Sequence, residues 1–192
     1  MSVIDTSDER LYKILEYALG EIIKNCCQNS SGSGFVSAQY YRQDGFVRIG
    51  ISDNGIGIKE SFRQSLSPHF IEGGSDRYFL EKALEPEVIS KNHNRGPYND
   101  PVNAGVRLSI VEEITSSTYG HFFLCSGRSW VYRDGQKQRQ FGELRSCFYP
   151  GVACSPAFRR NESYIYQDLI SEAKVKLGLI PDQIIENTDI FQ

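Results

Sequence analysis

The spacing of apolar side chains predicts an amphipathic helix near the start of the chain. Apolar residues recur at helical intervals and would bury one helix face: Leu11, Ile14, Leu15, Ala18, Ile22 and Cys26. The preceding Ser7-Asp8-Glu9-Arg10 supplies a capping side chain and early acidic residues that complement the helix dipole. The helical pattern fades near Gln28-Asn29-Ser30, where a Ser-Gly connection begins.

Short segments with strand patterns lie further along the chain: residues 35–42, 46–52, 121–125, 130–133, 138–144 and 151–158. Asp44-Gly45 separates the first two, and Asp-Gly is a strong hairpin signal. Asp134-Gly135 predicts a second hairpin in the same way. The alternation in residues 46–52 runs directly into a glycine-containing loop, so that loop is expected at a strand end.

The remaining patterned segments predict helices: residues 59–66, 76–84, 104–117 and 164–177. We therefore expect an α+β fold, a two-layer α/β sandwich whose mixed, mostly antiparallel sheet carries helices on one face. Residues 1–160 would form the domain, and residues 161–192 a C-terminal helix and polar tail. That helix either docks on the domain or mediates dimerisation. The long irregular stretch from Glu85 to Val102 is typical of a functional lid or of disorder.

Composition narrows the class of protein. The 192 residues are 40% hydrophobic and 12% aromatic, which is sufficient for one domain with a sizeable core. A net charge of -3 lacks the basic excess of a nucleic-acid binder, so no nucleic-acid partner is expected. No leader pattern or membrane-spanning apolar run is present, and five cysteines without paired spacing suit a reducing compartment better than metal ligation. We expect a cytoplasmic protein without a membrane partner.

Two side chains of the first helix can reach the same pocket. Glu21 and Asn25 are four residues apart, which places them on one helix face. A carboxylate can polarise water or a hydroxyl, and an amide oxygen suits Mg2+. The same spacing also describes an ordinary solvated helix face.

Two loops could contact a nucleotide. Asp53-Asn54-Gly55-Ile56-Gly57-Ile58 offers a carboxylate for an exocyclic amine, and its glycines allow a planar ring to approach the backbone; the segment could equally be a simple turn. Asn103-Ala104-Gly105-Val106-Arg107 opens the helix of residues 104–117. Free N–H groups there could cradle a phosphate, or the segment could be an ordinary helix start.

The three motifs, in this order and spacing, resemble the N, G1 and G2 boxes of the GHKL superfamily, which includes histidine kinases, anti-sigma kinases and type II topoisomerases. The resemblance extends from Leu11 to Phe158 and implies the Bergerat ATP-binding fold. It implies that Glu21 is the general base, that Asn25 binds Mg2+ and that Asp53 binds the adenine amine. The other nucleotide contacts would come from these residues: Gly55, Gly57, Ile58, Asn103, Ala104, Gly105, Val106 and Arg107. The 85–102 segment, with Lys91, His93 and Arg95, would be the ATP lid.

The sequence departs from the family pattern at the phosphate loop and at the last strand. Asn103 and Arg107 replace two G2 glycines, and Gly151-Val152 stands where the family often has Gly-Thr. The expected function is a Mg-ATP-dependent cytosolic ATPase or protein kinase with a protein partner or substrate, able to form a homodimer. The alternative is a catalytically weak, nucleotide-gated interaction module. Glu21 favours the enzyme, whereas Arg107 and Val152 favour the module.

Overall fold

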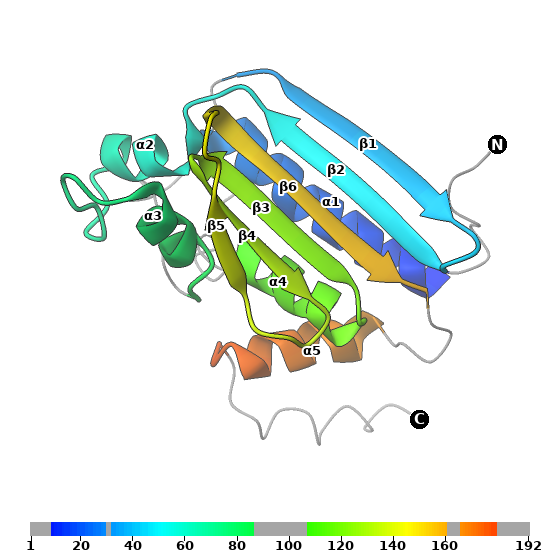
Figure 1. The fold of residues 1–192 in the computed structure, drawn as a ribbon. Helices are drawn as coiled ribbons and strands as arrows, with labels where there is room; N and C mark the ends of the chain where they lie inside the picture. The colour runs from blue at the N-terminus through cyan, green and yellow to red at the C-terminus, as the bar shows by residue number, and fades with distance from the viewer. Residues whose placement is uncertain (1–8, 30–31, 87–106, 161–165, 180–192) are drawn as a thin grey trace.

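The structure, a computed structural model, describes residues 9–29, 32–86, 107–160 and 166–179. Helices and strands alternate irregularly along the chain, as expected for an α+β protein (Figure 1). The helices are α1 (Glu9–Asn29), α2 (Gly57–Gln64), α3 (Asp76–Ala83), α4 (Arg107–Ser117) and α5 (Tyr166–Lys176). The strands are β1 (Gly34–Tyr41), β2 (Phe46–Asp53), β3 (His121–Gly127), β4 (Ser129–Asp134), β5 (Gln140–Glu143) and β6 (Tyr149–Arg159).

In the described part of the chain, the strands form one open sheet in the order β1-β2-β6-β3-β4-β5. Both predicted hairpins are confirmed, since β1 pairs with β2 and β4 pairs with β5. The expectation of a mixed sheet was wrong, because every one of these neighbouring pairs is antiparallel. The strands β2 and β3 run in the same direction, and β6, the last strand in sequence, lies between them and antiparallel to both.

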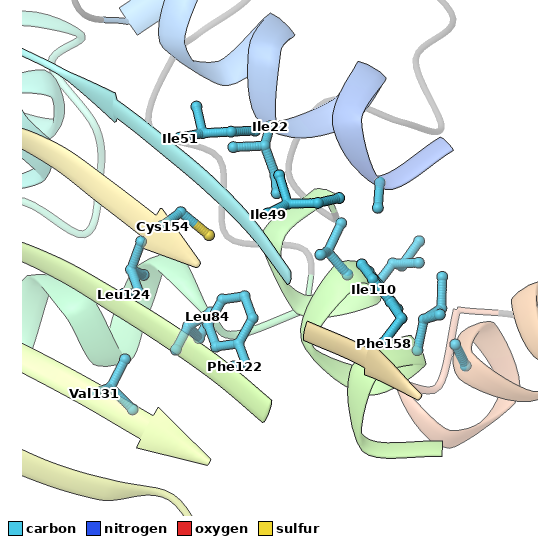
Figure 2. Close-up of a cluster of buried hydrophobic side chains, with 14 of the residues drawn as sticks. Ile22, Ile49, Ile51, Leu84, Ile110, Phe122, Leu124, Val131, Cys154 and Phe158 are labelled. Carbon is cyan, nitrogen blue, oxygen red and sulfur yellow. The ribbon is translucent and has the colours of Figure 1, made fainter. Parts of the chain in front are cut away.

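The helical layer lies against one face of this sheet. Figure 1 shows α1 and α4 behind the strands, α5 beside α4, and α2 with α3 at one end. Alternate side chains of β2 point into this layer, since Val47, Ile49 and Ile51 are buried between more exposed neighbours. They join one apolar core with side chains of the helices and of β3, β4 and β6, part of which Figure 2 shows: Ile22, Ile49, Ile51, Leu84, Ile110, Phe122, Leu124, Val131, Cys154 and Phe158.

The C-terminal helix docks on the domain. Leu169 and Ala173 of α5 are buried and belong to the same core as α1 and α4. The structure therefore shows docking, the first of the two alternatives for this helix. Within the described ranges, no helix combines the length and the apolar character needed to cross a membrane.

Candidate functional site

Asp53 is the last residue of β2 and is only 1% exposed. Because strand side chains alternate, it points toward the same helical layer as Ile49 and Ile51. A carboxylate thus occupies the end of a row of apolar residues. The alternation that buries Val47, Ile49 and Ile51 therefore also buries the Asp53 carboxylate.

The two carboxylate oxygens of Asp53 have different surroundings. Oδ1 accepts a hydrogen bond from the Gly55 backbone N–H at 2.9 Å. Oδ2 is buried and has no hydrogen-bond partner among the described residues. A buried polar atom left in this way costs free energy, and native proteins rarely retain one without a reason. This oxygen can accept a hydrogen bond from a ligand donor.

Hydrogen bonds fix the loop after Asp53 at its beginning. The Asn54 backbone N–H donates to the carbonyl oxygen of Ser33 at 3.2 Å, and the Ser33 N–H donates to Asn54 Oδ1 at 2.8 Å. The Asp53 carbonyl oxygen accepts from the Tyr149 hydroxyl at 2.9 Å. The backbone on either side of the Asp53 carboxylate is therefore held by β6 and by the residue before β1.

The far end of the loop is fixed by Ser126 of β3. Its Oγ accepts from the Ile58 N–H at 3.0 Å and donates to the Gly151 carbonyl oxygen at 2.8 Å. Gly57 has φ +71°, and a Cβ there would lie 2.5 Å from the Pro150 carbonyl oxygen. The glycine is thus required both by its backbone conformation and by the close approach of β6.

Gly151 also has a structural reason to be glycine. A Cβ at this position would overlap the Asp53 carbonyl oxygen and would lie 2.6 Å from Asp53 Oδ1. The missing side chain lets β6 pass directly beside the carboxylate. The next residue, Val152, packs against the core.

Glu21 lies on the buried side of α1, next to the core residue Ile22. It is 8% exposed, and its Oε1 accepts a hydrogen bond from Lys24 Nζ at 2.9 Å. The alternative interpretation of this spacing, an ordinary solvated helix face, does not fit the burial of Glu21. The side chain of Asn25, the predicted Mg2+ ligand, lies outside the described residues.

The predicted phosphate loop falls largely outside the described part of the chain. Residues 103–106, namely Asn103, Ala104, Gly105 and Val106, lie outside it, as do residues 87–102 of the predicted lid. Arg107 is the first residue of α4, and its side chain also lies outside the described set. The structure thus directs the Asp53 side chain toward the helical layer, in which Glu21 is also buried, whereas most of the third motif lies outside the described residues.

Sequence reasoning missed an ionic cluster on α4, the helix that follows the predicted phosphate loop. Arg139 donates to both carboxylate oxygens of Glu112, at 2.7 and 2.8 Å, and to the carbonyl oxygen of Leu84 at 3.2 Å. Arg133 Nη1 lies 3.0 Å from Glu113 Oε2. These contacts attach α4 to β4, to the segment before β5 and to the end of α3, which are distant in sequence. Local patterns therefore carried no signal for them.

A small cavity of about 150 Å³ opens on another side of the Asp53 loop. Its lining includes Gly57, Lys59, Arg63 and Phe148 but neither Asp53 nor Glu21. It is therefore distinct from the buried carboxylate site. Lys59 Nζ donates a hydrogen bond to the Gly74 carbonyl oxygen at 2.7 Å.

Comparison of the sequence with models of known protein families and with curated proteins found no match in either. The candidate site therefore depends on its own chemistry, which consists of a buried carboxylate with one unpartnered oxygen, a fixed glycine loop and a buried glutamate on the neighbouring helix layer.

Proposed function

We propose that this chain is a Mg-dependent ATP-binding domain of the GHKL type, acting as a regulatory ATPase or protein kinase. One observation carries the proposal: Asp53 is buried, with Oδ1 satisfied by the Gly55 N–H and Oδ2 left for a ligand. An exocyclic amine is a donor that complements a carboxylate oxygen. An adenine amine at Oδ2 would satisfy an atom that otherwise costs stability.

The loop geometry supports binding of a rigid planar group. Ser33, Ser126 and Tyr149 hold the loop from three sides through the hydrogen bonds described above. A site whose backbone is fixed before the ligand arrives loses less conformational entropy on binding. Gly151 lets β6 pass beside the Asp53 carboxylate, and Gly57 lets the loop pass close to the Pro150 carbonyl oxygen.

In this proposal Glu21 would be the general base for ATP hydrolysis or phosphotransfer. Its carboxylate is buried in the helical layer, where it could take a proton from water or from a Ser or Thr hydroxyl of a protein substrate. Asn25, one helical turn later, would hold Mg2+, and the bound ion would neutralise charge on the transferred phosphoryl group. Arg107 at the start of α4 would add positive charge beside the phosphates.

A second candidate is a nucleotide-gated interaction module with little turnover. It is favoured by the ion pair at Glu21, whose Oε1 lies 2.9 Å from Lys24 Nζ and is thus engaged before any substrate arrives. It is also favoured by Val152, which packs against the core where a hydroxyl would assist the nucleotide site. Binding of ATP would then act by changing which protein surface is available.

Calorimetry tests the binding claim directly. Asp53→Asn keeps the size of the side chain but removes the charge, and it should weaken Mg-ATP binding by about 10- to 100-fold, the value of a hydrogen bond to a charged group. Asp44→Asn, in the exposed β1–β2 turn, is the matched control and should bind as the wild type does. If Asp53→Asn binds with unchanged affinity, the adenine assignment is wrong.

A separate assay decides between the enzyme and the module. Radiolabelled ATP is incubated with the protein alone and with candidate partner proteins, beside a Glu21→Ala variant. Hydrolysis or phosphotransfer that depends on Glu21 supports the enzyme. ATP binding without either reaction above the level of the variant supports the module.

A further inference from the structure

Within the part of the chain that the structure describes, no strand pairs with the outer edge of β1. In the strand order of the described sheet, β1 is terminal and pairs only with β2 (Figure 1). It extends over eight residues, Gly34–Tyr41, and its first six are exposed. The opposite edge is formed by β5, which has only four residues, Gln140–Glu143. The edge formed by β1 is therefore twice as long as the edge formed by β5.

The free backbone groups of β1 can be assigned from the ladder. The Ser33 carbonyl oxygen accepts from the Asn54 N–H, which places Ser33 in a hydrogen-bonded pair with the β2 side. Because such pairs alternate in an antiparallel ladder, Phe35 and Ser37 also direct their backbone groups toward β2. The N–H and C=O groups of Val36, Ala38 and Tyr40 consequently point away from β2, toward the uncovered edge.

Apolar side chains border this row of free backbone groups. Val36 pairs with the buried Ile51 and shares its side of the sheet, yet Val36 is 56% exposed, because β1 extends beyond the helical layer. Among the described residues, eight large apolar side chains are exposed, and four of them belong to α1 or β1: Tyr12, Ile23, Phe35 and Val36. Half of the exposed apolar side chains in the described residues thus lie on α1 and β1.

β1 lacks the sequence features that usually prevent an edge strand from pairing with another chain. The segment Gly34-Phe35-Val36-Ser37-Ala38-Gln39-Tyr40-Tyr41 contains no charged residue and no proline, and its register with β2 is continuous, without a bulge. A long, flat, uncharged edge strand pairs readily with another chain. These features specify the chemistry of the partner, which must itself be an extended strand.

We infer that the partner is a second copy of this chain, with two β1 strands paired antiparallel across a twofold axis. Because β1 carries no charge, two copies meet without like charges opposite each other, whatever the register. In the register that places Val36 of one strand opposite Ala38 of the other, twofold symmetry gives every outward N–H of β1 a carbonyl oxygen of its partner. The pairing joins the two sheets into one and brings the Val36 side chains, together with the exposed side of α1, to the same interface. It does not depend on nucleotide binding.

Sedimentation equilibrium of the full chain over a range of concentrations tests this pairing. The wild type should dimerise, whereas Val36→Lys should raise the dimer dissociation constant by about 100-fold, roughly tenfold for each Val36 removed from the interface. Ala38→Pro, which removes an outward N–H but no hydrogen bond to β2, should have a similar effect. The matched control is Ile71→Lys, because Ile71 is also an exposed apolar residue but lies between α2 and α3. This control should dimerise as the wild type does.

Amide hydrogen exchange on the unmodified protein provides a second measurement that does not depend on variants folding. The amides of Val36, Ala38 and Tyr40 should exchange more slowly as the protein concentration rises, whereas those of β5 should not change. A wild type that stays monomeric overturns the proposal. So does a dimer that both β1 variants leave intact, or a dimer in which exchange from the β1 amides is independent of concentration.

Discussion

The ionic contact between Arg139 and Glu112 offers a quantitative test of how α4 is attached to the rest of the domain. Glu112 lies on α4 with its side chain 1% exposed, and Arg139 binds both of its carboxylate oxygens. The same guanidinium donates to the carbonyl oxygen of Leu84, at the end of α3. Arg139→Ala would therefore leave a buried carboxylate and a backbone carbonyl without these donors.

The expected loss follows from burial. Removing one partner of a buried ion pair typically costs about 3–5 kcal/mol, because the other charge stays buried. Here Arg133 Nη1 remains 3.6 Å from Glu112 Oε1 and Arg139 is itself partly exposed, so the lower end of that range applies. We expect Arg139→Ala to lower the free energy of unfolding by about 3 kcal/mol. For a chain of this size, the melting temperature should fall by roughly 6–12 °C.

Thermal unfolding followed by circular dichroism measures this loss. Arg63→Ala is the matched control, since Arg63 also donates twice to one carboxylate, that of Glu60, but at an exposed site. It should change the melting temperature far less. The double variant Arg139→Met, Glu112→Leu should recover most of the stability, because it leaves no uncompensated buried charge. If Arg139→Ala is no more destabilising than Arg63→Ala, burial does not govern this contact and the reasoning is refuted.

Two further predictions concern the glycine at the site and an exposed carboxylate. Gly151→Ala should reduce both stability and ATP affinity because its Cβ would overlap Asp53. Gly120→Ala, whose Cβ would overlap the carbonyl oxygen of Ala157, should reduce stability alone in paired unfolding and calorimetry measurements. Hydrogen bonds from Arg63, and then from Gln64, lower the pKa of Glu60 from 4.5 to about 2. The pair's contribution to stability is therefore present above about pH 4.5 and is lost as the pH falls toward 2. A carboxylate NMR titration should follow this shift, and Arg63→Ala should return the midpoint toward 4.5.

The local elements of the fold could be predicted because their signals are short in sequence. The apolar spacing that includes Ile14 and Ala18 predicts the buried face of α1, and Asp44-Gly45 predicts the β1–β2 hairpin; the structure has both. The position of β6 between β2 and β3 could not be predicted in this way. It pairs residues about a hundred positions apart, such as Ile51 with Cys154, and no local period encodes such a choice.

The residues of the candidate site also fall into those that local sequence patterns predict and those that they do not. The alternation of β2, continued by one residue, places Asp53 on the buried face, so this member of the site could be derived from sequence. Ser126 and Tyr149 could not, because each acts through side-chain hydrogen bonds to backbone groups that are distant in sequence. The relevant signal would be a polar residue inside an apolar strand, and Ser126 in β3 has that form.

The effects of Asp53 on ligand binding and on stability can be measured separately. Its Oδ1 accepts a hydrogen bond from the protein, whereas its Oδ2 has no partner among the described residues. Asn at this position can keep the hydrogen bond from the Gly55 N–H while removing a buried negative charge that lacks a partner at Oδ2. If the carboxylate serves a ligand, Asp53→Asn should unfold at the same temperature as the wild type or higher, while binding Mg-ATP more weakly. If it serves the fold, the substitution should lower the melting temperature as well. Measuring both quantities on one preparation, beside Asp44→Asn, therefore decides whether the buried carboxylate at the end of β2 is a binding residue or a structural one.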